Sequence, residues 1–155
     1  MNKKMPEWLG KKRLYNRNFS NINGDVIHWD VLKIEKSKNL KIRFISTNSK
    51  HRQGIHMRFF GKDGIITTNG TMSDSFDFWE DTCPKEFSVD CESKGGYLSI
   101  YNIFEEVNDS GRRRYEQMDS CGMILEQHDN IYRYRCNDVG FKSDFDKLIF
   151  ELEVL

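Results

Sequence analysis

Apolar and polar side chains alternate along short segments of this chain, and the alternation is clearest near its C-terminus. The last segment, 147–155, places four apolar side chains on one face: Leu148, Phe150, Leu152 and Val154. One buried and one solvated face are typical of a strand in an antiparallel sheet. Two further alternating segments, 122–127 and 131–136, flank a short polar turn, and they predict a β-hairpin.

The same alternation recurs upstream and predicts short strands joined by turns. These strands are expected at 26–34, 40–45, 54–60, 65–68, 75–80, 86–91 and 97–105. In the first of them, Ile27, Trp29 and Val31 share the face that we expect to be buried. Its connection to the second strand is short and polar, so we expect these two strands to pair. The segment 112–118 is compatible with an edge strand or a helical turn.

This spacing of short strands predicts an all-β domain, an antiparallel two-sheet β-sandwich or jelly roll. The domain is expected to span 25–155, with residues 1–24 forming an irregular N-terminal arm packed on the core. Composition agrees, because aromatic residues make up 13% of the chain and alanine is absent. Aromatic side chains favour strands, whereas alanine is the strongest helix former.

The net charge of the chain is zero, which argues against nucleic acid or a membrane surface as its partner. Lys+Arg and Asp+Glu both number 24, whereas proteins that bind nucleic acid or membrane surfaces usually carry a basic excess. The N-terminal residues lack the apolar run of a secretory signal, so we expect a cytoplasmic protein. The four cysteines are then expected to be thiols, and they lack the Cys-x-x-Cys spacing of structural zinc sites: Cys83, Cys91, Cys121 and Cys136.

An acidic loop precedes the last strand and is the candidate metal site. It carries four side chains with oxygen donors, the ligands that calcium prefers: Asn137, Asp138, Asp144 and Asp146. Alternatively, these side chains cap turns and bond their own backbone. We favour this structural role, because Lys142 and Lys147 can offset the repulsion among the carboxylates without a metal.

The residues around the start of the last strand also resemble a sequence found at the C-terminus of other proteins. The resemblance is carried by Asp144, Phe145, Asp146, Leu148, Ile149 and Phe150. It is to the C-terminal tail of bacterial aspartate-rich, lectin-like β-sandwich domains. It implies a β-sandwich and a carbohydrate-binding role that could use calcium. Lys147 departs from the pattern, where an acidic or neutral residue is expected, and its charge would repel a cation.

Arginine and tyrosine side chains form the candidate partner-binding surface. Both residue types are common anchors in protein interfaces. The candidate residues are Arg112, Arg113, Tyr132, Arg133, Tyr134 and Arg135. We expect them to contribute to one basic patch. The alternative is a solvated edge with an inward-facing pair of tyrosines.

The chain shows no pattern typical of a catalytic site. The four histidines form no His-x-His or His-x-x-x-His motif, and no glycine-flanked serine suggests a nucleophile. We therefore expect a non-enzymatic bacterial binding protein that recognises a protein partner, toxin neutralisation being one such role. The alternative is a lectin-like carbohydrate-binding module, with Trp29 and Trp79 as stacking platforms. The first hypothesis needs no cofactor, and the second could use calcium.

Overall fold

The computed structural model describes residues 6–19, 25–60, 63–141 and 144–155. These residues form strands and connecting segments, with no helix among them. The strands are β1 (Leu14–Tyr15), β2 (Ile27–Ile34), β3 (Ser37–Thr47), β4 (Arg52–Phe59), β5 (Gly64–Thr68), β6 (Thr71–Ser73), β7 (Ser75–Trp79), β8 (Glu86–Ser93), β9 (Gly96–Asn108), β10 (Gly111–Glu116), β11 (Gly122–His128), β12 (Ile131–Asn137) and β13 (Leu148–Val154). The all-β prediction is confirmed, and the ambiguous segment 112–118 contributes the strand β10.

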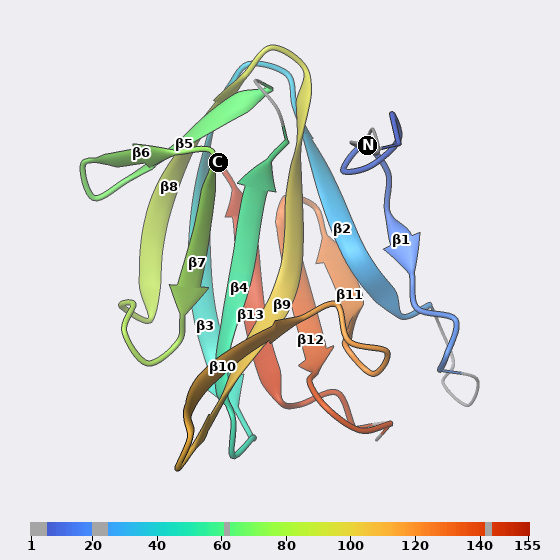
Figure 1. The fold of residues 1–155 in the computed structure, drawn as a ribbon. Helices are drawn as coiled ribbons and strands as arrows, with labels where there is room; N and C mark the ends of the chain where they lie inside the picture. Colours follow the sequence, from blue (N-terminus) through green and yellow to red (C-terminus); the bar gives the residue numbers. More distant parts are fainter. Residues whose placement is uncertain (1–5, 20–24, 61–62, 142–143) are drawn as a thin grey trace, which may run out of the picture.

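All strand pairs are antiparallel, and hydrogen bonds join them into one large sheet. Its order is β6-β5-β8-β3-β13-β12-β11-β2-β9-β4-β7, with β1 added to β2 and β10 added to β9. The sheet curls into a nearly closed barrel, with β4, β7 and β9 in front of β3, β12 and β13 (Figure 1). The predicted division into two separate sheets is not confirmed.

The predicted pairing of the first two long strands is wrong. β2 pairs with β9 and, through Ile27, with β11, whereas β3 lies between β8 and β13. The short connection after β2 crosses the end of the barrel instead of closing a hairpin. It bonds to the connection between β8 and β9, where Ser93 and Gly95 donate to the carbonyls of Lys36 and Ile34.

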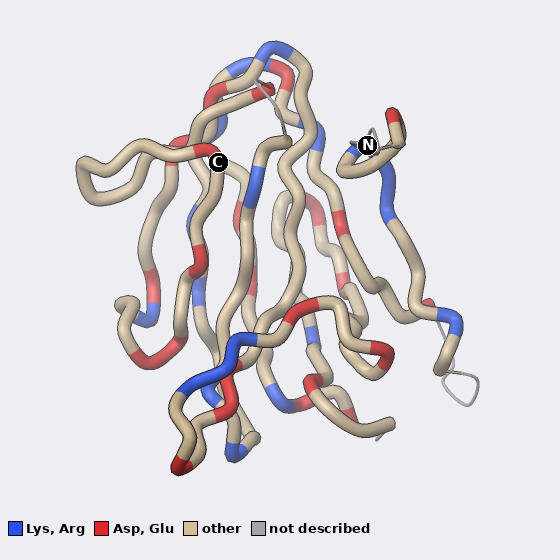
Figure 2. The backbone as a smooth tube through the Cα atoms, in the orientation of Figure 1, with Lys and Arg blue, Asp and Glu red and all other residues tan. Residues whose placement is uncertain are grey.

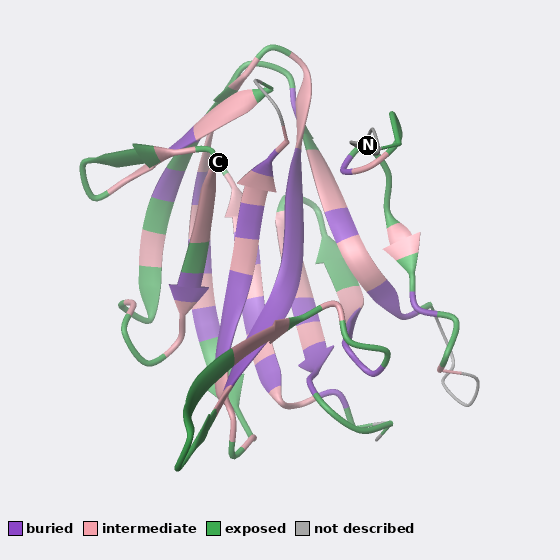
Figure 3. Cartoon of the chain, in the orientation of Figure 1, coloured by how far each residue is buried: buried purple, intermediate pink, exposed green. Residues whose placement is uncertain are grey.

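The core is built from the inward faces of the long strands, as the alternation predicts. Buried side chains from β3, β4 and β13 include Leu40, Ile42, Phe44, Ile55, Met57, Phe59, Leu148, Phe150 and Leu152. Burial alternates along these strands, and β9 is buried over most of its length (Figure 3).

The predicted buried face of β2 is wrong after Ile27. The register between β1 and β2 shifts, with Tyr15 opposite Ile27 and Leu14 opposite Trp29, so β2 holds one additional residue there. Such a bulge reverses which side chains point inward. Asp30 is therefore buried, whereas Trp29 and Val31 are only partly buried.

The buried carboxylate of Asp30 is held by donors from three segments. Arg13 Nε lies 2.8 Å from its Oδ1, and the Tyr134 hydroxyl donates to its Oδ2 at 2.7 Å. The backbone N–H of Val31 also donates to Oδ1 at 2.9 Å. Burial acts to lower the pKa of Arg13, but the hydrogen bond and charge of Asp30 outweigh it and raise that pKa. Burial raises the pKa of Tyr134 well above its usual range.

The described part of the N-terminal arm is attached to the barrel at several points. Gly10, at φ +74°, packs against the ring of Phe60, where a Cβ atom would approach to 2.7 Å. The buried Asn16 side chain donates to the carbonyls of Asp119 and Cys121 at 2.8 and 2.7 Å. Residues 1–5 and 20–24 of the expected arm lie outside the described residues.

Within the described ranges, no segment forms a helix long and apolar enough to cross a membrane.

Candidate functional site

The first half of the predicted metal loop is a buried hydrogen-bond network. Asn137 donates through Nδ2 to the carbonyls of Ser120 and Gly140 at 2.9 and 2.6 Å. Asp138 is 2% exposed, and its Oδ2 accepts from Ser49 Oγ at 2.5 Å and Gln53 Nε2 at 2.9 Å. Its Oδ1 accepts from the backbone N–H of Val139 at 2.6 Å. These contacts fix the first half of the loop through donors of the protein itself.

The second half of the loop is neutralised by a lysine. Lys147 Nζ lies 3.3 Å from Asp146 and 3.6 Å from Asp144, and Asn48 donates to Asp146 at 2.7 Å. Across the described ranges, no group of three or more histidine, cysteine, aspartate or glutamate side chains is placed to hold a metal ion. Lys142, which was also expected to offset the repulsion among the carboxylates, lies outside those ranges. Calcium binding by this loop stays the alternative to the predicted structural role.

The structure separates the residues predicted to form one basic patch. Arg112 and Arg113 lie on β10, which pairs with β9. Arg133 and Arg135 lie on β12, between β11 and β13 in the other part of the barrel (Figure 1). Tyr134 is 1% exposed and stacks on Phe150, with 4.8 Å between ring centroids, so its ring is unavailable to a partner.

The β12 arginines belong to a ladder of ion pairs on a solvated sheet face. Arg133 pairs with Glu151 at 3.0 Å, and Arg135 lies 3.9 Å from Glu126. Arg43 of β3 continues the ladder toward Glu86 and Glu153, at 2.6 and 2.9 Å. Tyr132 and Tyr134 stand opposite the inward residues Leu152 and Phe150. β12 therefore has the inward tyrosine pair of the alternative interpretation, although it is not an edge strand.

The β9–β10 hairpin differs from this face because it extends past the barrel and is exposed (Figure 3). β10 pairs with β9 along its whole length, and no strand of the described ranges pairs with its other side. Arg112 and Arg113 are exposed, and so is Val107, at 61%. Figure 2 shows the basic run on β10 beside acidic positions of β9. This hairpin is the most accessible of the predicted binding segments.

A hollow of about 360 Å³ lies between the turn end of the β9–β10 hairpin and the connection between β3 and β4. It is lined by Thr47, Ser49, Lys50, His51, Arg52, Gln53, Glu80, Asp81, Glu105, Val107 and Arg112. Arg52 crosses it, pairing with Asp81 at 2.7 Å and stacking over Trp79 at 4.4 Å. A Cβ atom on Gly54 would lie 2.8 Å from the Trp79 ring, so glycine lets this ring lie against the sheet.

Sequence reasoning missed an ionic network on the outer face of β4, β7, β9 and β10. Asp77 accepts from His56 Nδ1 at 2.6 Å and from Arg114 Nε and Nη2 at 2.7 and 3.0 Å. Glu116 accepts from Arg114 at 3.2 Å and from the Tyr101 hydroxyl at 2.5 Å. No local motif joins these residues, because only the pairing of β4 with β7 brings His56 to Asp77.

The charged side chains of this network are paired with one another. A histidine held by an aspartate can act as a general base when its other nitrogen faces a hydroxyl group. Here the nearby Tyr101 hydroxyl donates to Glu116, and Asp77 is occupied by Arg114. Burial raises the pKa of Asp77, but hydrogen bonds from His56 and Arg114 outweigh it and lower that pKa to about 2.

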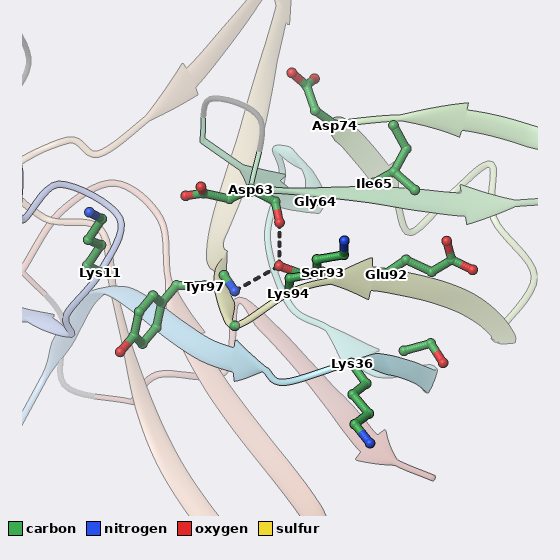
Figure 4. A pocket seen from close by; sticks show the side chains of 13 residues that line it. Lys11, Lys36, Asp63, Gly64, Ile65, Asp74, Glu92, Ser93, Lys94 and Tyr97 are labelled. Atoms are coloured by element: carbon green, nitrogen blue, oxygen red, sulfur yellow. Dashed lines mark hydrogen bonds between the residues drawn. The ribbon is translucent and has the colours of Figure 1, made fainter.

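A second, larger groove of about 1140 Å³ lies at the opposite end of the barrel. Figure 4 shows side chains of both charges around it: Lys11, Lys36, Lys94, Asp63, Asp74 and Glu92. Ser93 Oγ donates to the carbonyl of Asp63 and accepts from the N–H of Gly96. Three cationic and three anionic side chains give this groove no preference for the charge of a ligand.

The tryptophans of the carbohydrate hypothesis are packed by neighbours. Trp29 stacks with Phe60, with 5.4 Å between centroids, lies 5.1 Å from Tyr101, and donates to Ser99 Oγ. The Trp79 ring is covered by Arg52. Neither ring stands free as a stacking platform.

No protein-family model matches this chain, and neither a curated protein nor a solved structure matches it.

Calcium should leave the stability of the protein unchanged, because Asp138 is occupied by protein donors and Lys147 neutralises Asp144 and Asp146. A bound ion would stabilise the fold by about 2.7 kcal/mol at a hundredfold excess over its Kd. Thermal melts in millimolar calcium and in chelator measure this difference. An upward shift in Tm that Asp144→Asn abolishes would establish a calcium site.

The network around Asp77 should make stability depend on acid pH. The lowered pKa of this carboxyl contributes stability above its ordinary value of 3.8, and that contribution is lost as pH falls from 3.8 toward 2. Asp77→Asn should therefore be destabilising at pH 7, and its difference from wild type should shrink over that window. Urea unfolding at each pH measures this, with Asp109→Asn in the exposed hairpin turn as control. A constant difference would contradict the assigned role of Asp77.

Proposed function

We propose that this protein is a non-enzymatic, cytoplasmic binding protein that recognises a protein partner through its β9–β10 hairpin. The observation that supports this proposal is the exposed hairpin with an unpaired outer strand among the described residues. Proteins usually cover, shorten or charge such an edge, since it offers backbone N–H and C=O groups to another chain. Protein recognition by strand addition uses the same groups.

The side chains of the hairpin suit a protein interface. Arg112 and Arg113 are exposed, and arginine is enriched among residues that dominate binding energy. Val107 adds exposed apolar surface beside Arg112, its partner across the hairpin. Toxin neutralisation is one role of this kind. The closed ion pairs around His56 and the covered tryptophan rings favour this function over catalysis and over carbohydrate binding.

From the pairing of the strands we also propose that the barrel is a flattened β-sandwich. In this description β2, β9, β4, β7 and β10 form one layer, and the remaining strands form the other, with β2 shared at the junction. The hairpin then extends one layer past the other and leaves β10 open to a partner.

Site-specific photo-crosslinking tests the proposed surface. A photoreactive amino acid replaces Arg113 on the hairpin or, as a matched control, Arg133 on the opposite layer, in cells of the source organism. We expect a discrete protein adduct from position 113 and none from position 133, because Arg133 lies in the ion-pair ladder. Equal adducts from both positions, or none from position 113, would contradict binding through the hairpin.

A further inference from the structure

We propose that the partner presents an acidic, extended segment that adds to the sheet as a strand beside β10. This inference rests on the proposed function and specifies the chemistry of the partner. Within the described ranges, the outer side of Gly111–Glu116 pairs with no strand. In an antiparallel ladder, bonded and non-bonded pairs alternate, so part of the N–H and C=O groups of β10 face away from β9. These groups are available to an added strand.

The arginine run of β10 would flank such a strand on both of its faces. Arg112, Arg113 and Arg114 are consecutive, and successive side chains of a strand point to opposite faces of the sheet. Residues directly opposite on neighbouring strands have Cβ atoms about 4.5–5.5 Å apart, and pairs of opposite charge stabilise the sheet. An acidic segment therefore finds a cation on each face, whichever of its faces carries the carboxylates.

Two of these arginines are poorly neutralised within the chain. Glu105 lies 3.4 Å from Arg112 and 3.5 Å from Arg52, so one carboxylate serves two guanidinium groups. Arg113 stands opposite Glu106, and it lies within ion-pair distance of no carboxylate in the described ranges. Arg114, in contrast, is held by Asp77 and Glu116. Arg112 and Arg113 are therefore the arginines available to a partner.

A second copy of this chain is a poor occupant of the same edge. Antiparallel self-pairing centred on the arginine run places Arg113 opposite Arg114, or an arginine opposite its own copy. Like charges directly opposite each other destabilise a sheet. The same charges that prevent self-association therefore favour a strand that carries carboxylates.

The hollow beside the turn end of the hairpin adds positive charge to the same region of the surface. Lys50, His51 and Arg112 line it beside the exposed Val107. A carboxylate on the Arg112 face of the segment would lie beside Arg112, and β-branched residues between the carboxylates would favour the extended conformation of a strand. The segment that fits best alternates acidic and β-branched residues.

Synthetic peptides test this inference with fluorescence polarisation. The probe is a fluorescein-labelled peptide of sequence Thr-Glu-Val-Glu-Val-Glu-Thr. One control peptide replaces each glutamate with lysine, and another keeps the charges but replaces both valines with proline, which removes strand donors. We expect binding of the acidic peptide only, weakened by added salt because the contacts are ionic.

Matched variants locate the bound peptide. The double variant R112A/R113A should weaken its binding at least tenfold, whereas R133A/R135A on the opposite layer should leave it unchanged. Amide hydrogen exchange should slow along β10 when the peptide is present. Equal binding of the lysine peptide, equal loss in both double variants, or unchanged exchange in β10 would overturn the inference.

Absence of peptide binding separates the two proposals. If crosslinking from position 113 still yields a discrete partner, recognition by the hairpin stands and the acidic-strand inference is wrong. The arginines of β10 would then serve only to prevent this edge strand from pairing with another copy of the chain. If crosslinking also fails, both proposals are wrong.

Discussion

The carboxylate of Asp30 is the buried charge on which the arrangement of this protein depends. It is 2% exposed, and it receives hydrogen bonds from Arg13 of the arm, Tyr134 of β12 and the backbone of Val31. A buried charge is costly unless it is paired and its remaining acceptor sites are filled. These donors reach Asp30 together only when the arm and both parts of the barrel are in place.

Asp30 lies on β2, the strand that joins the two parts of the barrel. β2 pairs with β11 at Ile27 and with β9 from Asp30 onward. The bulge between these positions directs Asp30 inward, and Arg13 then fixes the arm against the barrel. From β2 the sheet continues through β9, whose far half carries β10. The network at Asp30 therefore supports the layer from which the proposed binding hairpin extends.

The sequence predicts the strands of this fold well and their partners poorly. Alternation identified the buried faces of β3, β4 and β13, because the apolar side chains of each recur at every second position. It failed in β2, where a bulge reverses the face and a charge occupies the core. No local pattern shows that Arg13, 17 positions away, neutralises Asp30. For the candidate site, the exposure of Arg112 and Arg113 was predictable, but their separation from Arg133 and Arg135 depends on strand order.

A double-mutant cycle on Arg13 and Asp30, measured by urea unfolding, tests the central role of this pair most directly. Arg13→Met should cost about 3 kcal/mol, because it leaves a buried carboxylate without its cation. The double variant with Asp30→Asn should be less destabilised than the sum of the single variants, by more than about 1 kcal/mol. Arg17→Met, which removes an exposed pair with Asp25 at 3.8 Å, should cost less than about 1 kcal/mol. Additive effects, or equal losses from Arg13→Met and Arg17→Met, would contradict the account.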